Sequence, residues 1–147
     1  MKILIATDGS SYSNVAVSEA AARPWPSGSE LRVLVVLEHP AISYVTGEEL
    51  GSAIYYQQIA KELRKSLEAL ATMATEQLKG KDHTVSYTVR EGIAAEEIID
   101  EAKQWHADLI MVGTHGRHGI SRFLLGSVAQ KVSIHAPCSV EIVRRKA

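Results

Sequence analysis

Short apolar runs recur along the chain, and stretches with helical spacing separate them. Runs rich in Val, Ile and Leu are typical of strands that are buried on both faces of a sheet. Three such runs cover residues 3–6, 31–37 and 109–112, and two weaker ones, interrupted by polar residues, cover 83–89 and 140–143. The pattern predicts five strands.

Apolar residues at steps of three and four predict a helix after each of the first four strands. The first follows Ser10-Ser11, two residues that favour a helix N-cap. The others cover residues 56–78, 95–106 and 128–136, the last being stopped by Pro137. Regular alternation of strand and helix predicts an α/β fold, a doubly wound parallel sheet with helices on both faces.

Composition predicts one domain spanning residues 1–147, with 46% hydrophobic and 22% charged residues. A net charge of −1 argues against binding to nucleic acid or to an anionic membrane. The single cysteine, Cys138, excludes an intrachain disulfide and fits a reducing compartment. No apolar stretch approaches the roughly 20 residues of a membrane span. We therefore expect a soluble, cytoplasmic protein.

Two of the predicted strands end in residues that carry chemistry. The first is followed by Thr7-Asp8-Gly9-Ser10, and the fourth by the glycine-rich segment 113–119. In an open parallel sheet, ligands bind beyond the carboxyl ends of the strands, where the strand order reverses. We expect these two strand ends to face one crevice.

The glycine-rich segment has the makings of an anion site. Gly113 and Gly116 lack a Cβ, so their amides can approach a ligand and their backbone can adopt positive φ. Ser127 and Gln130 fit a capping box at the start of the next helix, whose N-terminus favours an anion. The same glycines could instead serve tight turns while Ser127 only caps its helix, and the spacing alone leaves both interpretations open.

Neither common nucleotide fingerprint is present, because the chain has no P-loop lysine motif and no Gly-x-Gly-x-x-Gly. Gly113-x2-Gly116-x9-Gly126-Ser127 instead resembles the Gly-x2-Gly-x9-Gly-Ser/Thr signature of ATP-binding universal stress proteins. The resemblance extends over nearly the whole chain, including ILIATDGS, GIAAE (residues 92–96) before the third helix, ADLIMVGTHGR, LLGSVAQKV and HAPCSVEIV. The last segment departs slightly, with Cys-Ser-Val where the family more often has Cys-Pro-Val.

The resemblance implies the strand order 3-2-1-4-5, a homodimer joined through the last strand, and ATP as ligand, with AMP as a further candidate. It implies contacts to adenine and adenosine by Val36, Ala6, Thr7 and Asp8. It implies ribose and phosphate contacts by Gly113, Thr114, His115, Gly116, Arg117, Gly126, Ser127 and Val128, to which Arg122 can add charge.

Asp8 has three possible uses. Its carboxylate can accept hydrogen bonds from ribose hydroxyls, or hold a hydrated Mg²⁺ that accompanies ATP. Without the resemblance, a helix cap would be the simpler interpretation.

A metal site built on histidines and a reactive cysteine are both disfavoured. His115 and His118 could be joined by His106 or His135, but no acidic or thiolate partner completes a tetrahedral set. Cys138 opens an apolar strand after Pro137, so we expect a small buried side chain and no nucleophile.

Two functions fit these residues. The first is a nucleotide-dependent regulatory or stress-response module with little or no hydrolysis, whose signalling partner is unknown. The second is a slow ATPase or phosphoryl-transfer enzyme that uses the same site. Phosphoryl transfer needs cationic clamps and a residue that orients the nucleophile. No catalytic residue can be identified, so the sequence favours the regulatory module.

Overall fold

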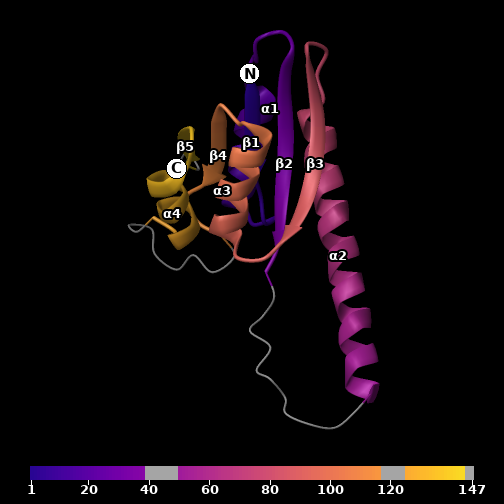
Figure 1. The fold of residues 1–147 in the computed structure, drawn as a ribbon. Helices are drawn as coiled ribbons and strands as arrows, with labels where there is room; N and C mark the ends of the chain where they lie inside the picture. The colour runs from indigo at the N-terminus through magenta and orange to yellow at the C-terminus, as the bar shows by residue number, and fades with distance from the viewer. Residues whose placement is uncertain (39–49, 117–124, 145–147) are drawn as a thin grey trace.

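A sheet of five parallel strands forms the centre of the molecule, in the order β3-β2-β1-β4-β5 (Figure 1). The computed structural model describes residues 1–38, 50–116 and 125–144. The strands are β1 (Lys2–Ala6), β2 (Ser29–Leu37), β3 (His83–Glu91), β4 (Leu109–Gly113) and β5 (Ser139–Val143). The predicted strands and their order are confirmed.

Two helices cover each face of the sheet. Helices α1 (Ser13–Ala22) and α2 (Leu50–Leu78) pack on one face, and α3 (Ala94–Trp105) and α4 (Ser127–His135) on the other. Alternate residues of β1 therefore enter different cores, Ile3 and Ile5 on the side of α1 and α2, and Leu4 on the side of α3 and α4. This double burial explains the unbroken apolar runs of the central strands.

Helix α2 is longer than its apolar spacing predicts, since it begins at Leu50 instead of residue 56. Its N-terminal part projects past the carboxyl ends of the strands (Figure 1). Along the apolar row spaced by four residues, exposure falls from 63% at Tyr55 and 45% at Ile59 to 5% at Leu67. Only the C-terminal half of α2 therefore belongs to the core.

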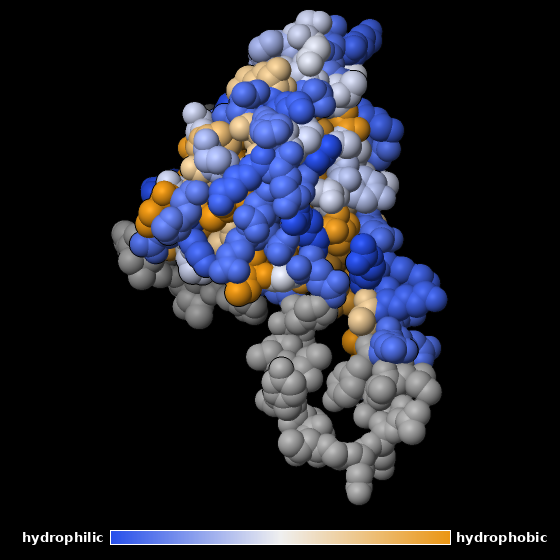
Figure 2. All heavy atoms as spheres, in the orientation of Figure 1, coloured by the Kyte–Doolittle hydropathy of each residue, from blue (hydrophilic) through white to orange (hydrophobic). Residues whose placement is uncertain are grey.

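The surface adds two smaller findings. Hydrophobic residues appear mainly as small patches between hydrophilic side chains on the face seen in Figure 2. Within the described parts of the chain, no helix is long and apolar enough to cross a membrane. Cys138 is only partly buried, against our expectation, and burial together with the charge of Asp108 raises the pKa of its thiol.

Candidate functional site

A cleft of about 700 Å³ opens at the carboxyl ends of the strands, a size typical of small-molecule sites. It lies across β1, whose two neighbours β2 and β4 connect to helices on opposite faces. The lining comes from the β1–α1 turn, the end of β2, helix α2, the β3–α3 turn, the end of β4 and the start of α4. The crevice expected between the first and fourth strand ends is thus present.

The chemistry of the lining changes along the cleft, following the order of the strands. The end beside β2 and β3 is mainly apolar, with Val36, Ile93 and Ile98 among its residues. Asp8 follows β1 in the middle. The end beside β4 is formed by glycines and by the first turn of α4. An elongated ligand with one apolar and one anionic end matches this order.

Hydrogen bonds hold the carboxylate of Asp8 in the β1–α1 turn. Its Oδ1 accepts from the amide of Ser10 at 3.0 Å and from the hydroxyl of Ser13 at 2.6 Å. The Ser13 hydroxyl also lies 3.0 Å from Oγ1 of Thr7, and Ser13 is buried. Helix α1 begins after Tyr12 without a side-chain cap, so Asp8 does not cap it. The N-cap position is Tyr12 and not Ser10 or Ser11. The Ser10 hydroxyl nevertheless accepts a hydrogen bond at 3.2 Å from the amide of Ser13, the first residue of α1, so the expected capping by serine is met in part.

The glycines after β4 serve close packing. Gly113 and Gly116 do not use the positive φ that a glycine can adopt, since positive φ among the described glycines occurs at Gly9, Gly28 and Gly92. A Cβ on Gly116 would lie 2.9 Å from Oδ2 of Asp8. A Cβ on Gly126 would lie 2.9 Å from the carbonyl oxygen of Thr114. The missing side chain at Gly116 therefore lets the segment after β4 approach Asp8 after β1, and the one at Gly126 lets the start of α4 pack on the end of β4.

Helix α4 begins one residue earlier than the predicted capping box requires. Its N-cap is Gly126, no described side chain caps it, and Ser127 is already its first helical residue. The capping box of Ser127 and Gln130 is thus wrong, and the Gln130 amide donates to the carbonyl of Gly126 at 2.9 Å. Ser127, Val128 and Ala129 of this first turn line the cleft. Such an N-terminus attracts anions, because its amides lack intrahelical acceptors.

His115 is one of the residues that line the cleft. Its Nδ1 lies 3.1 Å from Oγ1 of Thr114, and its ring lies 5.3 Å from the ring of Tyr12. Its Nε2 is buried and has no hydrogen-bond partner among the described residues. Within those residues, no group of three or more His, Cys, Asp or Glu could hold a metal ion.

Most of the expected site residues meet in the cleft. The lining includes Ala6, Thr7, Asp8, Val36, Gly113, His115, Gly116, Gly126, Ser127 and Val128. Thr114 is buried behind the lining, where it supports His115 and Gly126. Arg117, His118 and Arg122 lie outside the described residues.

The sequence analysis missed several lining residues, namely Ser13, Leu34, Leu37, Glu38, Leu63, Leu67, Gly92, Ile93, Ala94, Ile98, Val112 and Ala129. The apolar spacing of 56–78 indicated only that Leu63 and Leu67 belong to the core or to a partner surface. No local sequence pattern indicated that Glu38 lines the cleft, because its contact with the start of α3 depends on the pairing of β2 with β3.

The chain matches known proteins over almost its full length. Residues 1–144 match the family model of the universal stress protein family. A universal stress protein of Methanocaldococcus jannaschii is 34% identical over 145 residues, covering 98% of this chain and 82% of the relative. One of Bacillus subtilis is 32% identical over 145 residues, covering 97% of this chain and 98% of the relative.

Solved structures share the fold. The hypothetical protein MJ0577 superposes with a TM-score of 0.84 at 25% identity, covering 99% of this chain and 96% of that one. A universal stress protein in complex with cAMP gives 0.61 at 24% identity, with 97% and 95% covered. A family member from Arabidopsis thaliana with AMP bound gives 0.66 at 18% identity, with 100% and 93% covered.

Proposed function

This chain belongs to the universal stress protein family, and from that premise we propose that it is a regulatory module that binds an adenine nucleotide, with ATP as the expected ligand. The observation that carries the proposal is the order of chemistry along the cleft. Apolar residues at β2 and β3, a carboxylate at β1, and glycines with a helix N-terminus at β4 follow the order of base, ribose and phosphates. Structures of family members with cAMP and AMP bound support an adenine nucleotide.

In this proposal the two ends of the cleft bind different parts of the nucleotide, the base by apolar contact and the phosphates by backbone amides. Val36 offers an apolar surface to the base. Ala6, Thr7 and Gly113 border the ribose, and Asp8 accepts hydrogen bonds from its hydroxyls. His115, Gly116 and the first turn of α4 receive the phosphates.

Mg²⁺ would accompany ATP at the carboxylate of Asp8. This carboxylate lies beside Gly116, at the boundary between the ribose and phosphate portions of the cleft. A single carboxylate together with phosphate oxygens and water is the usual environment for Mg²⁺ on a nucleotide. The ion would neutralise phosphate charge, and Asp8 would hold it through water.

Binding with little or no hydrolysis is the mode that the lining favours. Among the described residues that line the cleft there is no lysine or arginine, and the carboxylates are Asp8 and Glu38. Rapid phosphoryl transfer needs cationic groups on the transferring phosphate and a residue that orients the nucleophile. We therefore propose a protein that signals through its bound state.

A homodimer in the cytoplasm completes the proposal. Strand β5 is at one edge of the sheet and pairs with β4 among the described strands, so its other side can add a second copy. Its Glu141 is held through two 2.7 Å hydrogen bonds by Arg23, the residue after α1, which keeps this edge strand tied to the core.

Isothermal titration of the purified protein with ATP and Mg²⁺ tests the nucleotide site. We expect micromolar affinity, which corresponds to about 8 kcal/mol. Gly116→Val places methyl groups between the loop and Asp8, and should weaken binding more than about tenfold, or about 1.4 kcal/mol. Gly28→Ala is the matched control, because Gly28 precedes β2 at the opposite end of the sheet.

Two results would contradict the proposal. If Gly116→Val binds ATP as tightly as the parent does, the phosphates do not bind at this loop. Release of ADP faster than roughly one per second, within the usual range of enzymes, would favour the ATPase instead.

A further inference from the structure

The turn between β3 and α3 forms one wall of the apolar end of the cleft. Gly92, Ile93 and Ala94 line the cleft there. The Gly92 amide donates to the carbonyl of Leu37 at 3.0 Å, and the Ala94 amide donates to Oε1 of Glu38 at 3.1 Å. Both contacts tie the turn to the end of β2, so its position relative to Val36 is fixed by β2 on this side.

The side chain of Glu97 lies against the same turn from the other side. Gly92 has a φ of 147°, and a Cβ there would lie 2.7 Å from Oε1 of Glu97. The Glu97 side chain therefore lies directly against Gly92, in space that any other residue would fill. Its second oxygen, Oε2, accepts a hydrogen bond from Nε of Arg90 at 2.6 Å.

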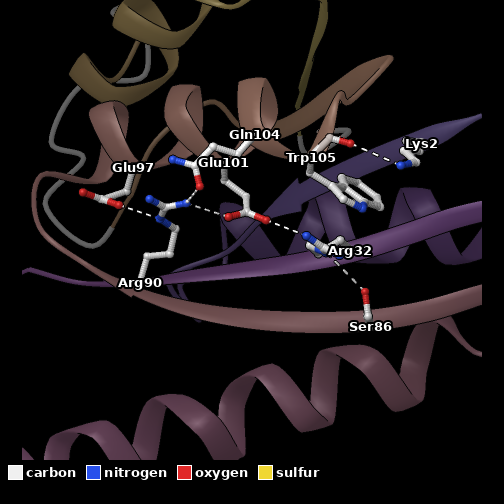
Figure 3. A network of polar contacts seen from close by, with 8 residues as sticks. All are labelled: Lys2, Arg32, Ser86, Arg90, Glu97, Glu101, Gln104 and Trp105. Carbon is white, nitrogen blue, oxygen red and sulfur yellow. Dashed lines mark hydrogen bonds and ion pairs between the residues drawn. The ribbon is translucent and has the colours of Figure 1, made fainter.

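Arg90 is itself held by a buried carboxylate (Figure 3). Its Nη1 donates to Oε2 of Glu101 at 2.7 Å, while Oε1 of Glu101 accepts from Nη1 of Arg32 at 2.7 Å. The side chain of Glu101 is 8% exposed, and the Arg32 guanidinium stacks 4.3 Å from the ring centre of Trp105. The Arg90 side chain is thus fixed on β3 by Glu101, and in this position it binds Glu97.

These contacts divide into two groups with different effects. Glu101 binds arginines of both β2 and β3, so it already docks α3 on the sheet. Glu97 adds no further strand, and its additional contact is Gly92, which borders the cleft. Glu97 thus adds to the docking of α3 on β3 through Arg90, and in addition lies against the turn that borders the cleft.

We propose that Arg90 and Glu97 are positioning residues that hold the β3–α3 turn against the base of the bound nucleotide. The inference rests on the proposed function and deepens it. Neither side chain lines the cleft, so both act through Gly92–Ala94. When the turn is already held in place, binding does not have to order it, and the affinity is higher for that reason. This gain in affinity comes from the base and sugar and does not depend on the phosphates.

The test compares ATP with adenosine by isothermal titration. In Glu97→Ala the turn loses its support, and both ligands should bind roughly tenfold more weakly. The ratio of the two dissociation constants should stay at the parent value, because the phosphate end is untouched. Glu97→Gln keeps the side chain over Gly92 and an acceptor for Arg90, and should restore most of the affinity.

Asp100→Ala is the matched control. Asp100 is exposed on the same helix, pairs with Lys103 at 3.9 Å, and loses the same charge when it is replaced. Its affinities for both ligands should equal those of the parent. If Glu97→Ala does not fold, Arg90→Lys, which lacks the Nε donor and the guanidinium plane, replaces it with the same expectation.

Each other outcome overturns the inference. Unchanged affinities in Glu97→Ala, while the parent binds ATP, would show that the turn needs no support. A loss that is much larger for ATP than for adenosine would indicate general disorder of the cleft. A parent that binds neither ligand would overturn the proposed function, and this inference with it.

Discussion

Gly113 shows how strongly a single position can depend on its neighbours. It ends β4 where that strand passes the first turn of α1, and a Cβ there would collide with the carbonyl oxygen of Tyr12. Its backbone does not have positive φ. The glycine is thus required by the packing of α1 on β4 in addition to any ligand, which makes Gly116 the cleaner position for a binding test.

Gly113→Ala should therefore lower the free energy of unfolding by about 2–3 kcal/mol, because overpacking against backbone has no easy relief. Gly28→Ala provides the comparison, since Gly28 has a φ of 79° and nothing within 4 Å of a Cβ. It should cost only about 1 kcal/mol, from backbone strain. Urea denaturation of both variants measures the difference, and equal losses would mean that α1 moves aside freely.

The residues of the site differ in how far the sequence could predict them. Asp8, Gly116 and Ser127 follow from a strand end and a glycine spacing, both of which are local features. The role of Ser13 between Asp8 and Thr7 depends on the exact course of a turn. The capping box at Ser127 fits the residue types but is off by one position, because Gly126 is the N-cap and Ser127 is already the first helical residue.

At the scale of the elements, the buried pairing of Glu101 joins α3 to β2 and β3. Burial alone would raise the pKa of Glu101, but hydrogen bonds from Arg90 and Arg32 outweigh it, and the pKa lies below its ordinary value. A carboxylate with a lowered pKa stabilises the fold above the pKa of the unfolded chain. That contribution is lost as the pH falls through the folded value.

Acid should therefore destabilise the parent more than Glu101→Gln. We expect the two proteins to differ in slope below about pH 4.3, the pKa of glutamate in an unfolded chain. Urea denaturation at pH 7 and at pH 3.5 measures, for each protein, how far the free energy of unfolding falls between the two pH values. Glu76→Gln, which removes an exposed partner of Lys79, should show the drop of the parent. Equal drops in all three proteins would mean that Glu101 gains nothing from its arginines.

Elements were predictable where burial shaped their sequence. The runs of β1 and β4 are apolar at each buried position, so both strands were found to within one residue. The start of α2 was missed, because Gly51 and Ser52 are weak helix formers and the periodic apolar positions begin only at residue 56. Contacts between elements, such as those of Arg32 and Arg90 with Glu101, follow from register and are not visible in any local pattern.

At the scale of the whole molecule, β1 depends on both halves of the chain. Ile3 pairs with Leu31 of β2 on one side and with Leu109 of β4 on the other. Ile3, Leu4 and Ile5 have no exposed surface. A fragment of residues 1–108 would leave this central strand as an apolar open edge.

Such a fragment should show no cooperative thermal transition by circular dichroism, whereas a chain ending at Arg144 keeps every described element and should melt like the parent. A cooperative transition in the fragment would mean that β1, β2 and β3 form a stable unit with their helices.

The pairing of β1 with β4 also has a consequence during synthesis. The ribosome releases the partner of Ile3 only after another hundred or so residues, at about 5–20 residues per second. For several seconds β1 therefore has an exposed apolar edge in the nascent chain. Its pairing with β4 also closes a long loop, which is slow. We therefore expect chaperones to bind the nascent chain at β1, and to release it once β4 has left the ribosome and paired with β1.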